Sequence, residues 1–230
     1  MKRLLFLFLV SLVGCSDSDQ QWNYIHVDIK EPNQNQVFNA GDNYRLIADI
    51  STPNTLRAIT IFIGNKDVPI KSLHSNQKHF IDTTFRIEPT KTTIIVRVRA
   101  EDNVGNYEDK ITLSFSPYQL PQACIKTNSI AIVAAIPLSS PVDENTYIHG
   151  DFNNNLLADN NYRLVPIPGT TKCSCISIPL SQDMTLQFNR GSQTSINQSY
   201  NCHNVYFGFS GLTPTPVGII LDRWKDIDCN

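Results

Sequence analysis

The chain has 230 residues, of which 41% are hydrophobic and 17% charged, and its formal net charge is −2. This length and composition indicate a folded protein of one or two domains, and the near-neutral charge gives no electrostatic basis for binding nucleic acid. Helix-forming runs are scarce, whereas Asn, Ser, Thr and Pro are frequent. We therefore expect an all-β protein of short strands joined by turns.

Residues 1–14 have the form of a secretion signal. Lys2 and Arg3 precede an apolar stretch at 4–10, which is far too short to span a bilayer. The run Leu-Val-Gly-Cys at 12–15 resembles the lipobox of bacterial lipoproteins. The resemblance implies cleavage between Gly14 and Cys15, diacylation of the Cys15 thiol and acylation of the new amino group. The alternative is an ordinary signal peptide with a chance cysteine.

The expected lipid anchor predicts a location at the bacterial outer membrane. Two or more acyl chains hold a protein stably on a membrane, whereas one chain binds marginally. Residues 15–21 are polar and read as a flexible tether. Ser16 after the cysteine resembles lipoproteins sent to the outer membrane, and the acidic stretch that follows resembles the surface-export signal of Bacteroidota lipoproteins. The alternative is a linker without an address.

The first predicted domain spans 22–117 and is a β-sandwich. Its expected strands cover 44–50, 57–64, 80–87, 92–100 and 109–115. Glu31-Pro32-Asn33, the run at 38–42 and the run at 100–106 resemble bacterial Ig-like domains. The resemblance implies a spacer or an adhesive unit. The loop Glu101-Asp102-Asn103, with Asp109, could also hold Ca²⁺, although Asn and Gly there favour a turn.

Residues 118–121 form a short linker between two prolines, and the second predicted domain spans 122–230. Its expected strands cover 129–136, 146–152, 162–167, 173–180, 184–188 and 218–224. The runs 147–154, 162–164, 185–192 and 219–224 resemble the β-sandwich modules that bind starch and glycogen, as in AMP-activated kinase. The resemblance implies a carbohydrate-binding-module-like sandwich. The Trp of that family would fall near Asn155, so one stacking platform is replaced by an amide.

Such modules stack aromatic rings on sugar faces, while polar groups contact hydroxyls. The candidate glycan-binding residues are Tyr162, Tyr200 and Tyr206 for stacking, and Asn153, Asn154, Asn155 and Arg190 for polar contacts. The alternative is that the tyrosines cap the core and that Arg190 makes a salt bridge. Trp224 is expected in the core.

Five cysteines besides Cys15 are disulfide candidates in an oxidising compartment: Cys124, Cys173, Cys175, Cys202 and Cys229. Cys124 and Cys229 could join the two ends of the second domain, and Cys202 could then pair with Cys173 or Cys175. Five thiols leave one unpaired, or paired with another chain. No metal site is expected, because closely spaced ligand pairs are lacking.

The sequence contains no nucleophile elbow, Walker loop or dinucleotide fingerprint, so we expect no enzyme and no cofactor. The preferred hypothesis is a membrane-anchored, non-catalytic lipoprotein that binds an α-glucan-like polysaccharide at the cell envelope. The alternative is a structural or protein-interaction lipoprotein whose second domain has lost the sugar site. The expected partners are the membrane, polysaccharide and other envelope proteins.

Overall fold

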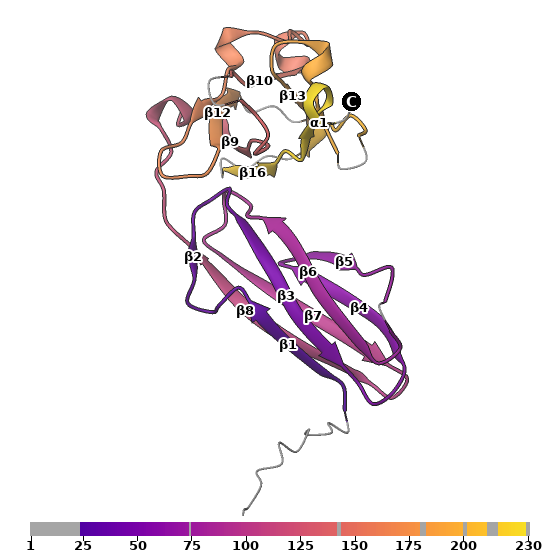
Figure 1. Cartoon of the computed structure of the whole chain (residues 1–230). Coiled ribbons are helices and arrows are strands. Elements are labelled where there is room, and N and C mark those ends of the chain that lie inside the picture. The colour runs from indigo at the N-terminus through magenta and orange to yellow at the C-terminus, as the bar shows by residue number, and fades with distance from the viewer. Residues whose placement is uncertain are drawn as a thin grey trace, which may run out of the picture.

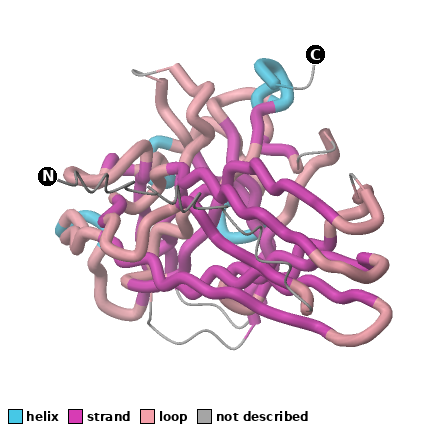
Figure 2. Tube along the Cα trace, turned by 60° about the horizontal axis from the view of Figure 1, so that its bottom comes forward, coloured by secondary structure: helices cyan, strands magenta, loops and turns pink. Residues whose placement is uncertain are grey.

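The computed structural model describes residues 24–73, 75–141, 144–179, 183–199, 202–210 and 216–228. Within these ranges the chain is nearly all β, with 3-10 turns and one short helix, α1 (Lys225–Asp228) (Figure 2). This confirms the predicted all-β class. No helix in the described ranges is long and apolar enough to cross a bilayer. The predicted signal peptide, the tether and Cys15 lie outside the described residues.

The N-terminal part, residues 24–117, is a sandwich of two sheets (Figure 1). The three-stranded sheet has the order β1 (His26–Glu31), β3 (Asn43–Ser51), β6 (Lys78–Arg86). The five-stranded sheet has the order β2 (Val37–Phe38), β8 (Asn106–Phe115), β7 (Thr93–Asp102), β4 (Leu56–Ile63), β5 (Lys66–Pro69). This strand order is that of an Ig-like sandwich, and the five predicted strands appear as β3, β4, β6, β7 and β8.

Alternation of apolar and polar residues builds this sandwich. In β3 the side chains of Tyr44, Leu46 and Ala48 are buried, whereas those between them are exposed or half-buried. In β7, which belongs to the opposite sheet, Val96 and Val98 are fully buried in the same core. Since successive side chains of a strand point to opposite faces, the two inner faces meet in one core.

The C-terminal part, residues 118–228, contains a second pair of facing sheets. One has the order β11 (Val165–Pro166), β12 (Cys173–Pro179), β9 (Ser129–Ala135), β16 (Val217–Ile220), with β16 parallel to β9. The other has the order β10 (Tyr147–Gly150), β13 (Asp183–Asn189), β15 (Phe207–Ser210). A short ladder joins β14 (Asn197–Gln198) and β17 (Arg223–Trp224). The two larger sheets share one core that includes Ile132, Ile178, Phe188 and Trp224.

Three strand predictions in this part need correction. The strand expected over 146–152 ends at Gly150, because the 3-10 turn Asp151–Asn153 begins there. The strand expected over 162–167 is reduced to β11, because Asp159 accepts a hydrogen bond from the Asn161 amide (2.9 Å) and starts a 3-10 turn at Asn160–Tyr162. The strand expected over 218–224 is split between β16 and β17. The burial of Trp224, at 0% exposure, confirms the prediction for that residue.

Candidate functional site

The loop after β10 contains the three asparagines predicted to make polar contacts with sugar, and they differ in exposure. Asn153 is buried: its Oδ1 accepts from the Gly150 amide (3.0 Å), and its Nδ2 donates to the Leu156 carbonyl (3.0 Å). The amide therefore organises the loop, and a sugar-contacting role is not supported for it. Asn154 and Asn155 are exposed, with φ of 52° and 58°. Both occupy the left-handed region, which Asn tolerates better than most residues.

Tyr162 lies against the core instead of forming an open platform. It is half-buried, and its ring centroid lies 4.9 Å from that of Phe152 with the planes tilted by 52°. The tilt and the separation are those of an aromatic pair that stabilises the sandwich. Tyr162 therefore joins the Asn loop to the core and offers only part of its surface to a ligand.

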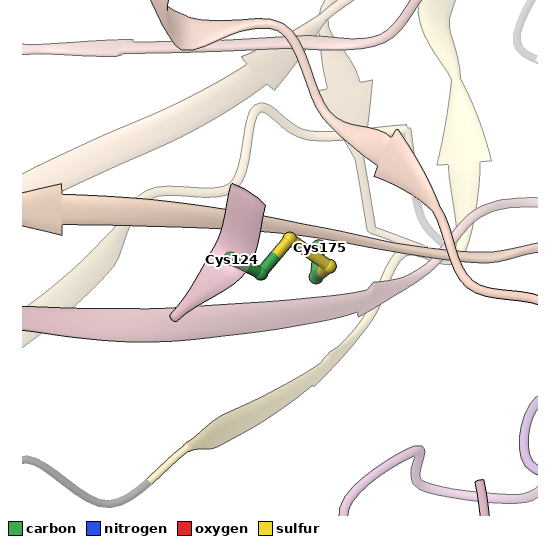
Figure 3. Close-up of a disulfide and its surroundings, with 2 residues drawn as sticks. All are labelled: Cys124 and Cys175. Carbon is green, nitrogen blue, oxygen red and sulfur yellow. A yellow bond between two sulfur atoms is a disulfide. The ribbon is translucent and has the colours of Figure 1, made fainter. Parts of the chain in front are cut away.

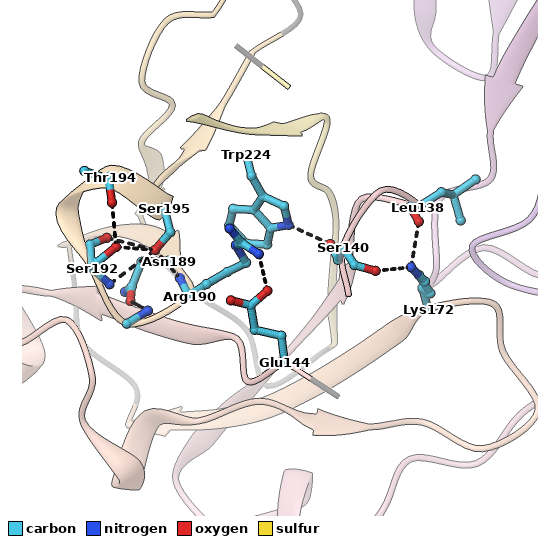
Figure 4. A network of polar contacts seen from close by, with 11 residues as sticks. Leu138, Ser140, Glu144, Lys172, Asn189, Arg190, Ser192, Thr194, Ser195 and Trp224 are labelled. Atoms are coloured by element: carbon cyan, nitrogen blue, oxygen red, sulfur yellow. Dashed lines mark hydrogen bonds and ion pairs between the residues drawn. The ribbon is translucent and has the colours of Figure 1, made fainter. Parts of the chain in front are cut away.

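Arg190 has a structural environment (Figure 4). Its side chain is only 6% exposed; the guanidinium forms an ion pair with Glu144 and lies 5.6 Å from the centroid of the Trp224 ring. The Trp224 indole donates from Nε1 to Ser140 Oγ (2.6 Å). These contacts tie the loop before β10 to the end of β13, so the predicted contact of Arg190 with sugar is not supported.

Tyr206 is the exposed aromatic candidate, with 61% of its surface accessible. It precedes β15, whose Phe207 pairs with Leu186, which in turn pairs with Gly150 at the end of β10. Tyr206 is therefore two strands, about 10 Å, from the Asn loop. A cavity of about 410 Å³ is lined by Tyr206 and by residues of β15 and β16. Tyr200 lies outside the described residues.

The polar side chains on the outer face of β10 and β13 are buried. His149 Nδ1 lies 2.9 Å from Asn189 Nδ2, and Asn189 Oδ1 accepts from the Gly191 amide (2.7 Å). Burial lowers the pKa of His149, and a hydrogen bond with Gln187 opposes this shift. The neutral imidazole is therefore favoured, and the cluster holds the end of the sheet rather than presenting a titrating group to a ligand.

The cysteine pairing differs from the prediction. Cys124 is bonded to Cys175, with their Cα atoms 6.0 Å apart (Figure 3). Cys173 is free and buried. Cys202 is also disulfide-bonded. The expected Cys124–Cys229 pair and the expected pairing of Cys202 with Cys173 or Cys175 are therefore wrong; Cys229 lies outside the described residues. The Cys124–Cys175 bond is possible because the 3-10 turn Gln122–Cys124 lies against β12.

Cys173 lies in the junction between the two parts of the chain. Its neighbours in a small apolar cluster include Ala40 from the N-terminal part and Val133 from β9. The Thr171 amide donates to the Ala40 carbonyl (2.8 Å), and the Thr171 hydroxyl donates to Asp42. Burial raises the pKa of the Cys173 thiol to about 11. The thiol is therefore held protonated and shielded where the parts meet.

The linker is part of the same junction. Tyr118 and Leu120 pack against the cluster around Cys173, and the Tyr118 hydroxyl donates to the Pro89 carbonyl. Burial raises the pKa of Tyr118 to about 12. Tyr118 also lies in the 118–121 linker predicted between prolines. The segment thus bridges the two parts by packing as well as by chain connection.

The acidic loop near residue 101 is a hydrogen-bonded turn. Asp102 Oδ1 accepts from the amides of Val104 and Gly105, both at 2.8 Å, while Oδ2 accepts from Thr52 Oγ1 (2.6 Å) and Asn54 Nδ2 (3.1 Å). These bonds, the Thr52 bond foremost, lower the pKa of Asp102. The carboxylate oxygens are occupied by donors, which favours the predicted turn over the Ca²⁺ alternative.

Sequence reasoning missed a groove on the N-terminal part, which we name the basic groove. It consists of two adjoining depressions of about 920 and 700 Å³ that share Ile63, Lys66, Glu88 and Ile94. The first covers the outer face of the five-stranded sheet. The second continues to Asp222 and Arg223 of the C-terminal part. Alternating charges on β7 and β8 were the available signal, but in the sequence they resemble any solvated strand face.

Comparison with known proteins gives no family. No protein-family model and no curated protein matches the chain. Among solved structures, the major pilin subunit of Bacillus cereus matches at 10% identity, covering 86% of this chain and 70% of the pilin, with a TM-score of 0.28. A titin fragment matches at 11% identity, covering 85% of this chain and 99% of the fragment, with a TM-score of 0.26. Scores this low carry no argument, so the Ig-like assignment rests on strand order alone.

Proposed function

We propose that the chain is a lipid-anchored, non-catalytic protein of the bacterial outer membrane, in which the N-terminal sandwich holds the C-terminal sandwich in a fixed orientation away from the membrane. The single observation that supports the fixed orientation is the packed junction around Cys173. A flexible display would need only a linker, whereas here Thr171, Ala40 and Asp42 join the parts through hydrogen bonds.

The position of the start of β1 fits this proposal. His26 at the start of β1 pairs with Ser51 at the end of β3, while Asn43 at the start of β3 borders the junction. Eight residue steps along β3 correspond to about 27 Å. An anchor at Cys15 would therefore attach at the end of the N-terminal sandwich opposite the junction, and the C-terminal part would be presented outward.

Two experiments test the proposal. Cells fed a palmitate analogue should label the wild-type protein and leave Cys15→Ala unlabelled; equal labelling of both would contradict the anchor. For the rigid junction, limited proteolysis of the full chain in neutral detergent should spare residues 118–121, because Tyr118 and Leu120 are packed. Rapid cleavage there in the native protein would contradict a fixed orientation.

Polysaccharide binding at the cell surface is the second candidate function, and the exposure of Tyr206 favours it. With Asn153 and Arg190 engaged internally, stacking on Tyr206 is the aromatic contact left for a neutral glucan, and Asn154 and Asn155 are the exposed polar candidates. On a glycan array, the Tyr206→Ala variant of the full chain should give no binding signal. Tyr107→Ala is the matched control, because Tyr107 is exposed on the other sandwich. An unchanged signal would leave the C-terminal part as a protein-interaction or structural unit.

A further inference from the structure

The basic groove is positively charged on a chain whose net charge is −2. Six cations line it, against the three carboxylates of Glu88, Glu108 and Asp222. The cations are Lys66, Arg86, Lys91, Arg97, Lys110 and Arg223. A local excess of cations on an otherwise acidic protein concentrates anions at that surface.

The carboxylates leave part of this charge uncompensated. Glu108 forms ion pairs with both Arg97 (3.6 Å) and Arg99 (3.1 Å), and Glu88 forms one with Lys91 (3.8 Å). Among the described residues, neither Lys66 nor Lys110 forms an ion pair within 4 Å. Burial raises the pKa of Asp222, and the charges of Lys66 and Arg223 oppose this shift. Asp222 therefore offsets part of the charge of Lys66 at longer range, while both exposed ammonium groups remain free of a close ion pair.

The register of the sheet places like charges side by side. Arg97 on β7 pairs directly with Lys110 on β8, and both side chains lie on the outer face. Their Cβ atoms are therefore about 5 Å apart, and like charges in this arrangement destabilise a sheet. The Arg97 guanidinium is further held over the ring of Phe62, 4.5 Å from its centroid. Stability alone would favour a carboxylate opposite Arg97, so the pair points to an anion.

We propose that the basic groove binds an anionic polysaccharide, one whose repeats carry carboxylate, sulfate or phosphate groups. The lysines would contact the anionic groups. Amides and hydroxyls that line the same groove can bond sugar hydroxyls: Asn43, Asn65, Thr84 and Thr93. Ile95, which is 48% exposed, supplies apolar surface for a sugar ring face.

The shape of the groove favours an extended ligand over the anchoring membrane. Two adjoining open depressions suit a chain of linked units better than a single small anion, and a hollow lining suits it better than a flat lipid surface.

The test uses the full chain in neutral detergent with polygalacturonate, and dextran as the neutral control. Wild type should bind polygalacturonate, with affinity falling steeply as salt rises, and should bind dextran much more weakly. Removing one exposed charge contact, by Lys66→Gln or Lys110→Gln, should weaken binding about fivefold, and the double variant about 25-fold. Lys78→Gln and Lys126→Gln, which change exposed lysines outside the groove, are the matched controls and should bind as wild type.

Several results would overturn the proposal. These are no binding of polygalacturonate at low salt, dextran binding of equal strength, or unchanged affinity in the double variant when its thermal midpoint shows that it is folded. Tighter binding of polyglutamate or of an oligonucleotide would assign the groove to another class of ligand. The groove uses neither Cys15 nor Tyr206, so its failure is distinguishable from failure of the anchor or of neutral-glucan binding.

Discussion

Substituting Gly41 is the sharpest perturbation of the junction. Gly41 has φ of +83°, and a Cβ added there would overlap the Thr171 carbonyl oxygen and lie 2.6 Å from Cys173 Sγ. Both neighbours belong to the C-terminal part. Gly41→Ala therefore cannot be accommodated without separating the loop before β3 from the loop before β12, and we expect it to open the junction.

The magnitude follows from the contacts at Gly41. A non-glycine residue in the left-handed region costs about 1–2 kcal/mol. Displacing the loop also breaks the Thr171–Ala40 backbone hydrogen bond, worth about 1 kcal/mol, and weakens the bond from Thr171 to the Asp42 carboxylate, worth about 1.5 kcal/mol or more. The junction should therefore lose about 3–4 kcal/mol.

Reactivity of the Cys173 thiol reports this opening directly. A thiol reagent reaches Cys173 only when the junction opens, so a loss of about 3 kcal/mol should raise the labelling rate at least 100-fold. Exposure also removes the burial that raises the pKa of the thiol to about 11, and so increases the thiolate fraction. Cys173→Ser in the same background should abolish the signal and identify the reacting group.

Gly169→Ala is the matched control. Gly169 has a similar φ of +75°, but a Cβ there would meet nothing within 4 Å. It therefore carries the backbone strain without the overlap, and Cys173 should stay protected. Equal labelling rates for wild type and Gly41→Ala, with both proteins folded, would refute the idea that this contact closes the junction.

Three further predictions concern stability. Asp102→Ala should lower the free energy of unfolding by about 3 kcal/mol, because it removes a carboxylate that accepts four hydrogen bonds; a change below 1 kcal/mol in urea denaturation would contradict this. Lys110→Gln should raise the unfolding free energy by about 0.5 kcal/mol by relieving its repulsion of Arg97, while weakening polygalacturonate binding; a loss of stability would show that Lys110 is structural. Burial lowers the pKa of His149, so the folded state takes up its proton less readily than the unfolded state. The contribution of neutral His149 to the free energy of unfolding is therefore complete above the ordinary pKa of about 6.5 and is lost as the pH falls below it. Between pH 7.5 and 5.5, wild type should lose more stability than His149→Gln, and equal losses would contradict this.

The strands of the N-terminal part could be predicted because their burial alternates. Tyr44, Leu46 and Ala48 face the core at every second position, and the same period marks β7. β5 was missed because its four residues are mostly exposed and lack that alternation. β1 was missed although Val27 is buried, since its remaining residues give little contrast.

The cysteine pairing could not be read from the sequence. Cys173 and Cys175 are two apart on β12 and both belong to the junction cluster, yet only Cys175 is met by the turn that carries Cys124. Which thiol is reached depends on how the linker returns across the sheet. That path is a tertiary property, and spacing between cysteines does not encode it.

The candidate glycan residues show the same limit. Asn153 and Asn154 are adjacent in sequence, but one side chain is buried in its own loop and the other is exposed. Arg190 forms its ion pair with Glu144, which is 46 residues away in the sequence. The basic groove was missed for the converse reason, since the pairing of Arg97 with Lys110 becomes visible only when β7 and β8 are in register.

A distance distribution across the junction tests the rigid two-part arrangement most directly. Spin labels on Cys residues introduced at Glu101 and Asn160, both exposed and on different parts, can be measured by electron paramagnetic resonance in a Cys173→Ser background. The packed junction predicts one narrow distance peak that broadens when Gly41→Ala is added. A broad distribution before that substitution would contradict a fixed orientation of the C-terminal sandwich.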